Sequence, residues 1–185
     1  FQSTSWARYW YAQASTGYDR TIGLHRFGGK LFYDQKQTLF NFDLPSVLSN
    51  YAFQGNYNYA RKYFVEGALN YSGYSRYQKG SQYGLFYAGG LGWDLAQENF
   101  IKNKVKWMNQ LKLRGTYGKT GNANVDNYGY YIWNAHFENV NLSYPIGSEY
   151  PGPIGVQEGA KLANVNATWE KAYKLDLGLD LDLFN

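Results

Sequence analysis

The chain has 185 residues, 20% of them aromatic, with 21 glycines, no cysteine and a net charge of +4. This composition favours sheet over helix, and without cysteine no disulfide framework holds the fold. The cations are dispersed and accompany no recognised binding motif, so nucleic-acid binding is not expected. The sequence begins at Phe1 without a signal-peptide pattern, which indicates a processed product or a piece of a longer protein.

The low mean hydropathy of −0.57 does not by itself exclude a membrane protein. The sequence contains no run of about 18 apolar residues that could form a spanning helix. In a transmembrane β-strand, however, every second residue faces the lumen and can be polar. The informative signal is therefore alternation with a period of two residues.

This alternation predicts about seven β-strands in a single domain that covers residues 1–185. The first strand, Tyr9–Tyr18, alternates weakly, and the second strand, Arg26–Lys36, alternates more clearly. The residues between them, Thr21–His25, are predicted to form the connecting turn. The third strand is predicted over Ser49–Ala60, and the tight connection Arg61-Lys62 that follows it indicates a hairpin.

The fourth and fifth strands carry aromatic residues at both ends of one apolar face. On the fourth strand this face runs from Tyr63 to Tyr71, and on the fifth, Tyr83–Asp94, it runs from Tyr83 to Trp93. At about 3.3 Å per residue and a tilt of about 40°, these intervals span about 20 and 26 Å, close to the ~25 Å apolar band between the aromatic girdles of outer-membrane barrels. The spacing therefore indicates a wall that lies in a membrane.

The remaining elements follow the same pattern. The connection Gln97–Asn109 is predicted to contain a short helix, and the sixth strand, Gln110–Tyr117, places its charges on one side. In the seventh strand, Tyr173–Leu183, five alternate leucines face one way and three aspartates the other. Amphipathic strands on a soluble core would give the same alternation, but shared terminal aromatics on five strands favour lipid.

Connection lengths alternate as they do in outer-membrane barrels, where short periplasmic turns face longer extracellular loops. If the Arg61-Lys62 turn is periplasmic, the longer connections Gln37–Leu48, Gly73–Gln82 and Gly118–Glu170 all lie on the exterior side. The Gln97–Asn109 connection is longer than this rule prefers.

Specific strings in the second part of the chain resemble the SusC/RagA-like TonB-dependent transporters of the Gram-negative outer membrane. The resemblance covers roughly Tyr51 to Asn185, with the family's order and spacing, and it departs from the family where an acidic residue is absent from Tyr71–Tyr77. The matching strings are Asn56-Tyr57-Asn58-Tyr59, Arg61-Lys62-Tyr63-Phe64, Gly92-Trp93-Asp94-Leu95, Leu111-Lys112-Leu113-Arg114-Gly115-Thr116-Tyr117-Gly118, Thr120-Gly121-Asn122, Trp169-Glu170-Lys171 and Leu177-Gly178-Leu179-Asp180.

The resemblance implies an antiparallel transmembrane β-barrel of about twenty-two strands in the bacterial outer membrane, of which this chain is a mid-barrel portion. It also implies a plug inside the barrel, a SusD-like surface lipoprotein as partner, and import of oligosaccharides or peptides with energy delivered through TonB. The chain contains no candidate plug and no TonB-contacting segment. It is therefore expected to contact outer-membrane lipid and to act as a transport component.

No catalytic, metal or cofactor site is expected, because the two histidines, His25 and His136, have no metal-like or triad-like spacing to acidic or nucleophilic residues. Aromatic residues in the long loop suit sugar rings or peptide backbones, although they could instead pack the loop on itself. These candidates are Tyr128, Tyr130, Tyr131, Trp133, Tyr144 and Tyr150. Polar residues on the lumen-facing sets are candidates for lining the channel or anchoring the plug: Glu66, Asn70, Asp94, Arg114 and Asp176.

Two other functions fit the same alternation. One is a surface-attached β-protein that binds glycans without transport, and the other is a structural or secretion barrel without energised uptake. The first is distinguished by whether extraction requires detergent, and the second by whether a plug and a SusD-like lipoprotein belong to the same complex.

Overall fold

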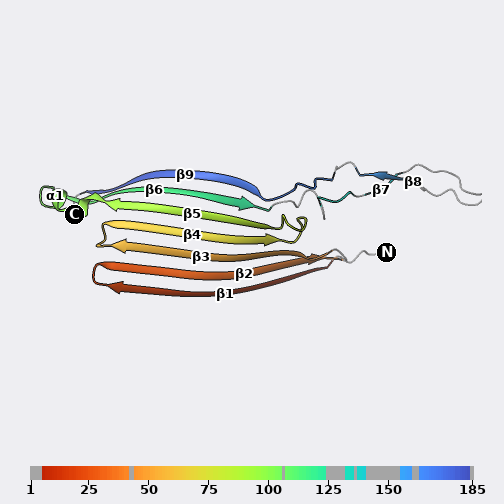
Figure 1. Cartoon of the computed structure of the whole chain (residues 1–185), viewed down its shortest axis with the longest axis horizontal. Coiled ribbons are helices and arrows are strands. Elements are labelled where there is room, and N and C mark those ends of the chain that lie inside the picture. Colours follow the sequence, from red (N-terminus) through yellow and green to blue (C-terminus); the bar gives the residue numbers. More distant parts are fainter. Residues whose placement is uncertain are drawn as a thin grey trace, which may run out of the picture.

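The chain forms one large antiparallel sheet (Figure 1). The computed structural model describes residues 6–41, 44–105, 107–123, 132–135, 137–140, 155–159 and 163–183. The sheet has seven strands in the order β1-β2-β3-β4-β5-β6-β9. Their bounds are Ala7–Ile22 (β1), His25–Phe40 (β2), Ser46–Tyr59 (β3), Tyr63–Tyr74 (β4), Tyr83–Asp94 (β5), Met108–Asn122 (β6) and Glu170–Leu183 (β9). The predicted all-β, antiparallel fold is confirmed, with the first and last strands at opposite edges.

The connections hold three further kinds of element. The helix predicted between the fifth and sixth strands is confirmed as a 3₁₀ turn, Leu95–Gln97, followed by α1, Asn99–Lys102. The segment expected to be one long loop instead contains a second sheet, in which β7, Phe137–Val140, pairs with β8, Gly155–Glu158. These strands have four residues each, too few for an alternation to stand out. None of the helices in the described ranges has the length and apolar character needed to cross a membrane.

At one end of the sheet, the hairpin between β1 and β2 is tighter than the sequence predicts. The predicted turn Thr21–His25 is wrong, because β1 continues to Ile22, which pairs directly with His25. Gly23 takes the left-handed conformation there, with φ of 59°. Alternation continues through such a two-residue turn, so the pattern does not mark its position.

The second tight hairpin lies within one residue of its predicted place. Ala60 and Arg61 both have left-handed φ values, 53° and 58°, as a type I′ turn requires. The Asn58 side chain accepts a hydrogen bond from the Arg61 amide at 2.9 Å. The two hairpins are joined, since the Ala60 amide donates to the Leu24 carbonyl at 2.7 Å.

The two faces of the sheet differ in chemistry. We call the face that carries the leucine row of β9 the outer face, and the opposite one the inner face. Leucines on the outer face are among the most exposed apolar residues of the described chain, with Leu175 at 71% and Leu177 at 78%. The strands pair without a register shift except between Met108 and Gln110, so the alternate sets stay in phase across the sheet.

Aromatic side chains form a row at each end of the outer face. Near the tight hairpins the strand pairing places His25, Tyr59, Tyr63 and Trp93 side by side. Their successive ring centroids are 4.8, 6.3 and 6.2 Å apart. Near the other end, the rings of Tyr33 and Tyr51 are 4.9 Å apart and those of Tyr71 and Tyr83 are 5.0 Å apart. Aromatic residues therefore bound the apolar face at both ends, as the sequence predicts.

Leu177→Arg is expected to destabilise the full-length protein in a lipid bilayer by about 2–4 kcal/mol, because it would place a cation near the bilayer midplane. The matched control is Thr116→Arg, which introduces the same side chain on the inner face, next to Gly115, the pairing partner of Leu177, and should cost much less. Folding titrations of both variants in lipid vesicles measure the difference. Equal losses would contradict lipid contact at the outer face.

Candidate functional site

A groove with a volume of about 1050 Å³ lies on the inner face, at the end of the sheet opposite the tight hairpins. Strands β2 to β6 contribute to it, together with Trp169 at the entry to β9. We call it the inner groove. Its polar, cationic and aromatic lining side chains include Lys36, Thr38, Ser46, Asn50, Asn70, Ser72, Tyr74, Arg76, Phe86, Lys119, Thr120, Asn122 and Trp169.

A chain of hydrogen bonds forms the polar floor of the groove. Asp34, Asn50 and Ser72 lie on one rung across β2, β3 and β4. The Asn50 amide donates to Asp34 Oδ2 at 2.9 Å, and the hydroxyl of buried Ser72 donates to Asn50 Oδ1 at 2.7 Å. Nearby, Asn70 Oδ1 is buried and has no hydrogen-bond partner among the residues that the structure describes. Because a buried acceptor without a partner is costly, Asn70 offers a position for a ligand donor or a water molecule.

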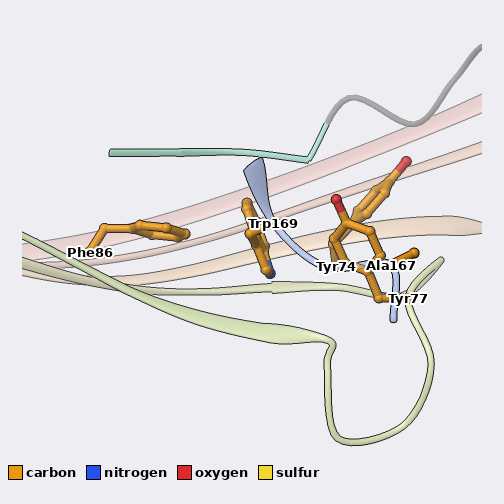
Figure 2. Close-up of a cluster of buried hydrophobic side chains, with 5 residues drawn as sticks. All are labelled: Tyr74, Tyr77, Phe86, Ala167 and Trp169. Carbon is orange, nitrogen blue, oxygen red and sulfur yellow. The ribbon is translucent and has the colours of Figure 1, made fainter. Parts of the chain in front are cut away.

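Aromatic side chains form one wall of the groove (Figure 2). Trp169 lies between Phe86 and Tyr77, with ring centroids 5.2 and 6.0 Å away, and Tyr77 contacts Tyr74 edge-on at 5.5 Å. The Trp169 indole donates to the Gln82 carbonyl at 3.0 Å, which fixes the ring beside the 75–82 loop. With Ala167, these residues form the buried apolar cluster of the described sheet.

Two glycines make room for the Phe86 ring. A Cβ at Gly84 would lie 2.6 Å from Phe86 Cζ, and one at Gly121 would overlap the same ring atom. The Trp169 ring closes a further side, so Phe86 is held from three directions. The aromatic wall is thus fixed in position by close packing of the surrounding backbone.

The groove is lined by more cations than anions. Lys36, Arg76 and Lys119 all lie along it, and the Lys119 ammonium is 5.7 Å from the centre of the Phe86 ring. The nearby carboxylate of Asp34 already accepts from Asn50. Flat aromatic faces beside amides and cations suit the rings of sugars or the backbone and carboxylate of peptides.

The sequence-predicted loop residues are only partly described. Trp133 is half-buried, next to Ile132, which packs against the aromatic cluster and whose carbonyl accepts from the Asn164 amide at 2.8 Å. The other candidates lie outside the described residues: Tyr128, Tyr130, Tyr131, Tyr144 and Tyr150. A contact of this loop with a ligand stays a prediction.

The five lumen-facing candidates all lie on the inner face, but the structure does not bring them together. Asn70 lines the groove, whereas Glu66 and Asp176 are exposed along the sheet. Arg114 Nε lies 3.4 Å from Asp180 Oδ1 across the β6–β9 pairing. Asp94 is buried, and its carboxylate accepts from the backbone amides of Ala96 and Leu111 at 3.2 and 3.3 Å.

Sequence reasoning did not identify the aromatic wall. Alternation along the fifth strand puts Phe86 on the face opposite Tyr83 and Trp93, and the available signal was one large ring among glycines and an alanine. Trp169 was noted only as part of a string that resembles the family, and Tyr74 and Tyr77 were predicted to lie in the connection Gly73–Gln82. Tyr74 ends β4, Tyr77 lies in the 75–82 loop, Phe86 is in β5 and Trp169 precedes β9, so only the folded structure shows that these four residues meet. No group of acidic and histidine side chains suited to a metal ion occurs in the part of the chain that the structure describes.

Comparisons with known proteins identify relatives of one kind. No family model matches the sequence. The TonB-dependent receptor P3 of Formosa agariphila is 33% identical over 130 residues, which are 70% of this chain and 12% of the receptor. The TonB-dependent receptor SusC of Bacteroides thetaiotaomicron is 32% identical over 144 residues, 76% of this chain and 14% of the receptor. The chain thus spans about an eighth of the length of these curated relatives.

The solved structure of the RagAB peptide transporter has a similar fold. It matches 98% of this chain and 22% of its own chain, with a TM-score of 0.75 and 17% sequence identity. The same complex in its closed-closed state gives a TM-score of 0.75 with 16% identity. At this identity the likeness concerns the fold alone.

Gly121→Ala is expected to destabilise the full-length protein by about 1–3 kcal/mol, because its methyl group would overlap the Phe86 ring, whose movement Gly84 and Trp169 already restrict. Gly67→Ala is the matched control, since a Cβ at Gly67 meets no atom within 4 Å. Denaturant titrations give both values. A loss at Gly67→Ala equal to that at Gly121→Ala would contradict the packing described for Phe86.

Proposed function

The chain belongs to the SusC/RagA-like TonB-dependent receptors of the bacterial outer membrane, and on this premise we propose that it forms part of the wall of a nutrient importer. The importer takes up oligosaccharides or peptides, is energised through TonB and works with a SusD-like surface lipoprotein. The main observation behind this proposal is that the two faces of the sheet differ. The outer face is apolar and bounded by aromatic rows, and the inner face holds a polar and aromatic groove.

We assign residues 1–185 to the barrel domain and the plug to another part of the full-length transporter. In hydrocarbon, no water satisfies the free backbone groups at a sheet edge, so a spanning sheet must close into a barrel. Within the described sheet, β1 and β9 each pair on one side only. Further strands of the full-length protein are proposed to pair with both edges.

The direction of the strands follows from the connections. We assign the tight hairpins at Gly23 and Ala60 to the periplasmic side, and the 75–82 loop with the inner groove to the exterior side. The groove then lies near the outer mouth of the barrel, where substrate enters. Deeper on the inner face, Glu66, Arg114 and Asp176 are positioned to hold the plug through ion pairs and hydrogen bonds.

The groove is compatible with both substrate classes. Aromatic faces such as Trp169 bind the apolar face of a sugar ring or a peptide side chain, and the Asn70 acceptor binds a hydroxyl or an amide. The name of the RagAB structure describes a peptide transporter, but a likeness in fold does not select between peptide and oligosaccharide.

Uptake by intact cells tests the proposal. A strain that lacks the gene is complemented with the full-length transporter and grown on a panel of oligosaccharides and of mixed peptides as sole nutrient. Growth on at least one nutrient should require the transporter and should disappear when TonB is disrupted. Growth that persists without TonB would contradict energised import and favour a passive barrel.

A matched pair of variants tests the groove in the same cells. Asn70→Leu removes the buried acceptor and should reduce apparent affinity for the imported nutrient about three- to tenfold, the value of one hydrogen bond. Gln54→Leu makes the same kind of change on the inner face of β3, outside the residues that line the groove. Equal effects of the two variants would remove the groove from the binding site.

A further inference from the structure

The connection between β5 and β6 is held against the outer face at the end of the tight hairpins. Glu98 lies between the 3₁₀ turn and α1. Its carboxylate accepts hydrogen bonds from the Tyr63 hydroxyl at 2.7 Å and from the Trp93 indole at 3.2 Å. Both rings belong to the aromatic row of the outer face, so these bonds fix the connection on the side that meets lipid.

The negative charge of Glu98 is balanced by the positive charge of Lys62. Lys62 Nζ lies 3.1 Å from Glu98 Oε2. Hydrogen bonds from Tyr63, and then from Lys62 and Trp93, hold the pKa of the Glu98 carboxyl below its ordinary value, so it stays ionised at neutral pH. Glu98 is also the only acidic residue between Leu95 and Trp107 in the sequence. The exposed Lys102 and Lys104 therefore give the described part of the connection a net positive charge.

The same connection exposes large apolar side chains beside those lysines. Phe100 is 60% exposed and Trp107 is 50% exposed, and Lys102 and Lys104 between them are exposed as well. Exposed aromatic rings close to cations are typical of segments that lie at the headgroup level of a membrane. Figure 1 shows α1 at the same end of the sheet as the turns between β1 and β2 and between β3 and β4. Trp93, the last ring of the aromatic row, lies two residues before the start of the connection at Leu95.

We propose that residues 95–107 form an interfacial anchor that binds anionic phospholipid headgroups. Lys102 and Lys104 contact the lipid phosphates, while Phe100 and Trp107 lie among the upper acyl chains. The proposal rests on the membrane position of the outer face and on the periplasmic placement of the hairpins, and it makes no use of the inner groove. Binding of a protein partner is less well supported, because the Glu98 bonds hold the connection at the lipid-facing rim.

Lipid binding to the purified full-length transporter tests the anchor. Native mass spectrometry with added phosphatidylglycerol or phosphatidylcholine measures the affinity of each lipid. For the double variant Lys102→Gln/Lys104→Gln, binding of phosphatidylglycerol should weaken about thirtyfold, from the loss of two cations near the surface. Binding of phosphatidylcholine should change little, and millimolar inorganic phosphate should not compete.

The matched control removes two exposed lysines at the opposite end of the sheet, Lys79→Gln/Lys171→Gln, and should leave this affinity unchanged. The conservative variant Lys102→Arg/Lys104→Arg should retain the affinity of the unmodified protein. Equal affinities in the Gln variant and the unmodified protein would overturn the anchor, as would competition by free phosphate. Because nutrient uptake is not the readout, failure here is distinguishable from failure of the transport proposal.

Discussion

The continuous backbone pairing of seven strands is the constraint on which the rest of the structure depends. Because side chains alternate with a period of two, a slip of one residue in any strand would move its whole apolar set to the other face. The pairing keeps the sets in phase from β1 to β9, apart from one shift at the start of β6. A single sheet can therefore present lipid with one surface and the lumen with another, without a second layer to bury either.

The two ends of the sheet use the same residue types for different purposes. At the hairpin end, Tyr63 and Trp93 direct their polar atoms to Glu98 and leave their rings on the apolar face. At the other end, Trp169 directs its indole N–H to a loop carbonyl and presents its ring to Phe86 on the inner face. In each case one hydrogen bond orients a large ring, which is how an amphipathic aromatic residue acts where apolar and polar surroundings meet. The end of the sheet at which an aromatic residue lies therefore decides whether it joins an aromatic row or the wall of the inner groove.

Much of the fold could be predicted from the sequence, because alternation reports directly on strands that have two unlike faces. The leucine row of β9 and the aromatic ends of β4 and β5 were predicted correctly for this reason. Alternation does not reveal a turn that keeps the two-residue period, such as the one at Gly23. It also does not reveal strands of only four residues, such as β7 and β8. Alternation could not predict the inner groove, because Phe86, Tyr74 and Trp169 come together only when elements distant in sequence pack against one another.

In the proposed barrel, the outer-face side chains of these strands contact lipid, and the inner-face side chains between them contact water. A spin-label scan of β9 in the full-length transporter tests this arrangement most directly, and the chain contributes no cysteine that would compete for the label. Each residue from Tyr173 to Leu183 is replaced in turn by cysteine and labelled in a bilayer, and collision with oxygen and with a water-soluble nickel complex is measured. Oxygen contact should peak at the tyrosine and leucine positions, and nickel contact at the positions between them. A profile without a two-residue period, or one with the opposite phase, would contradict it.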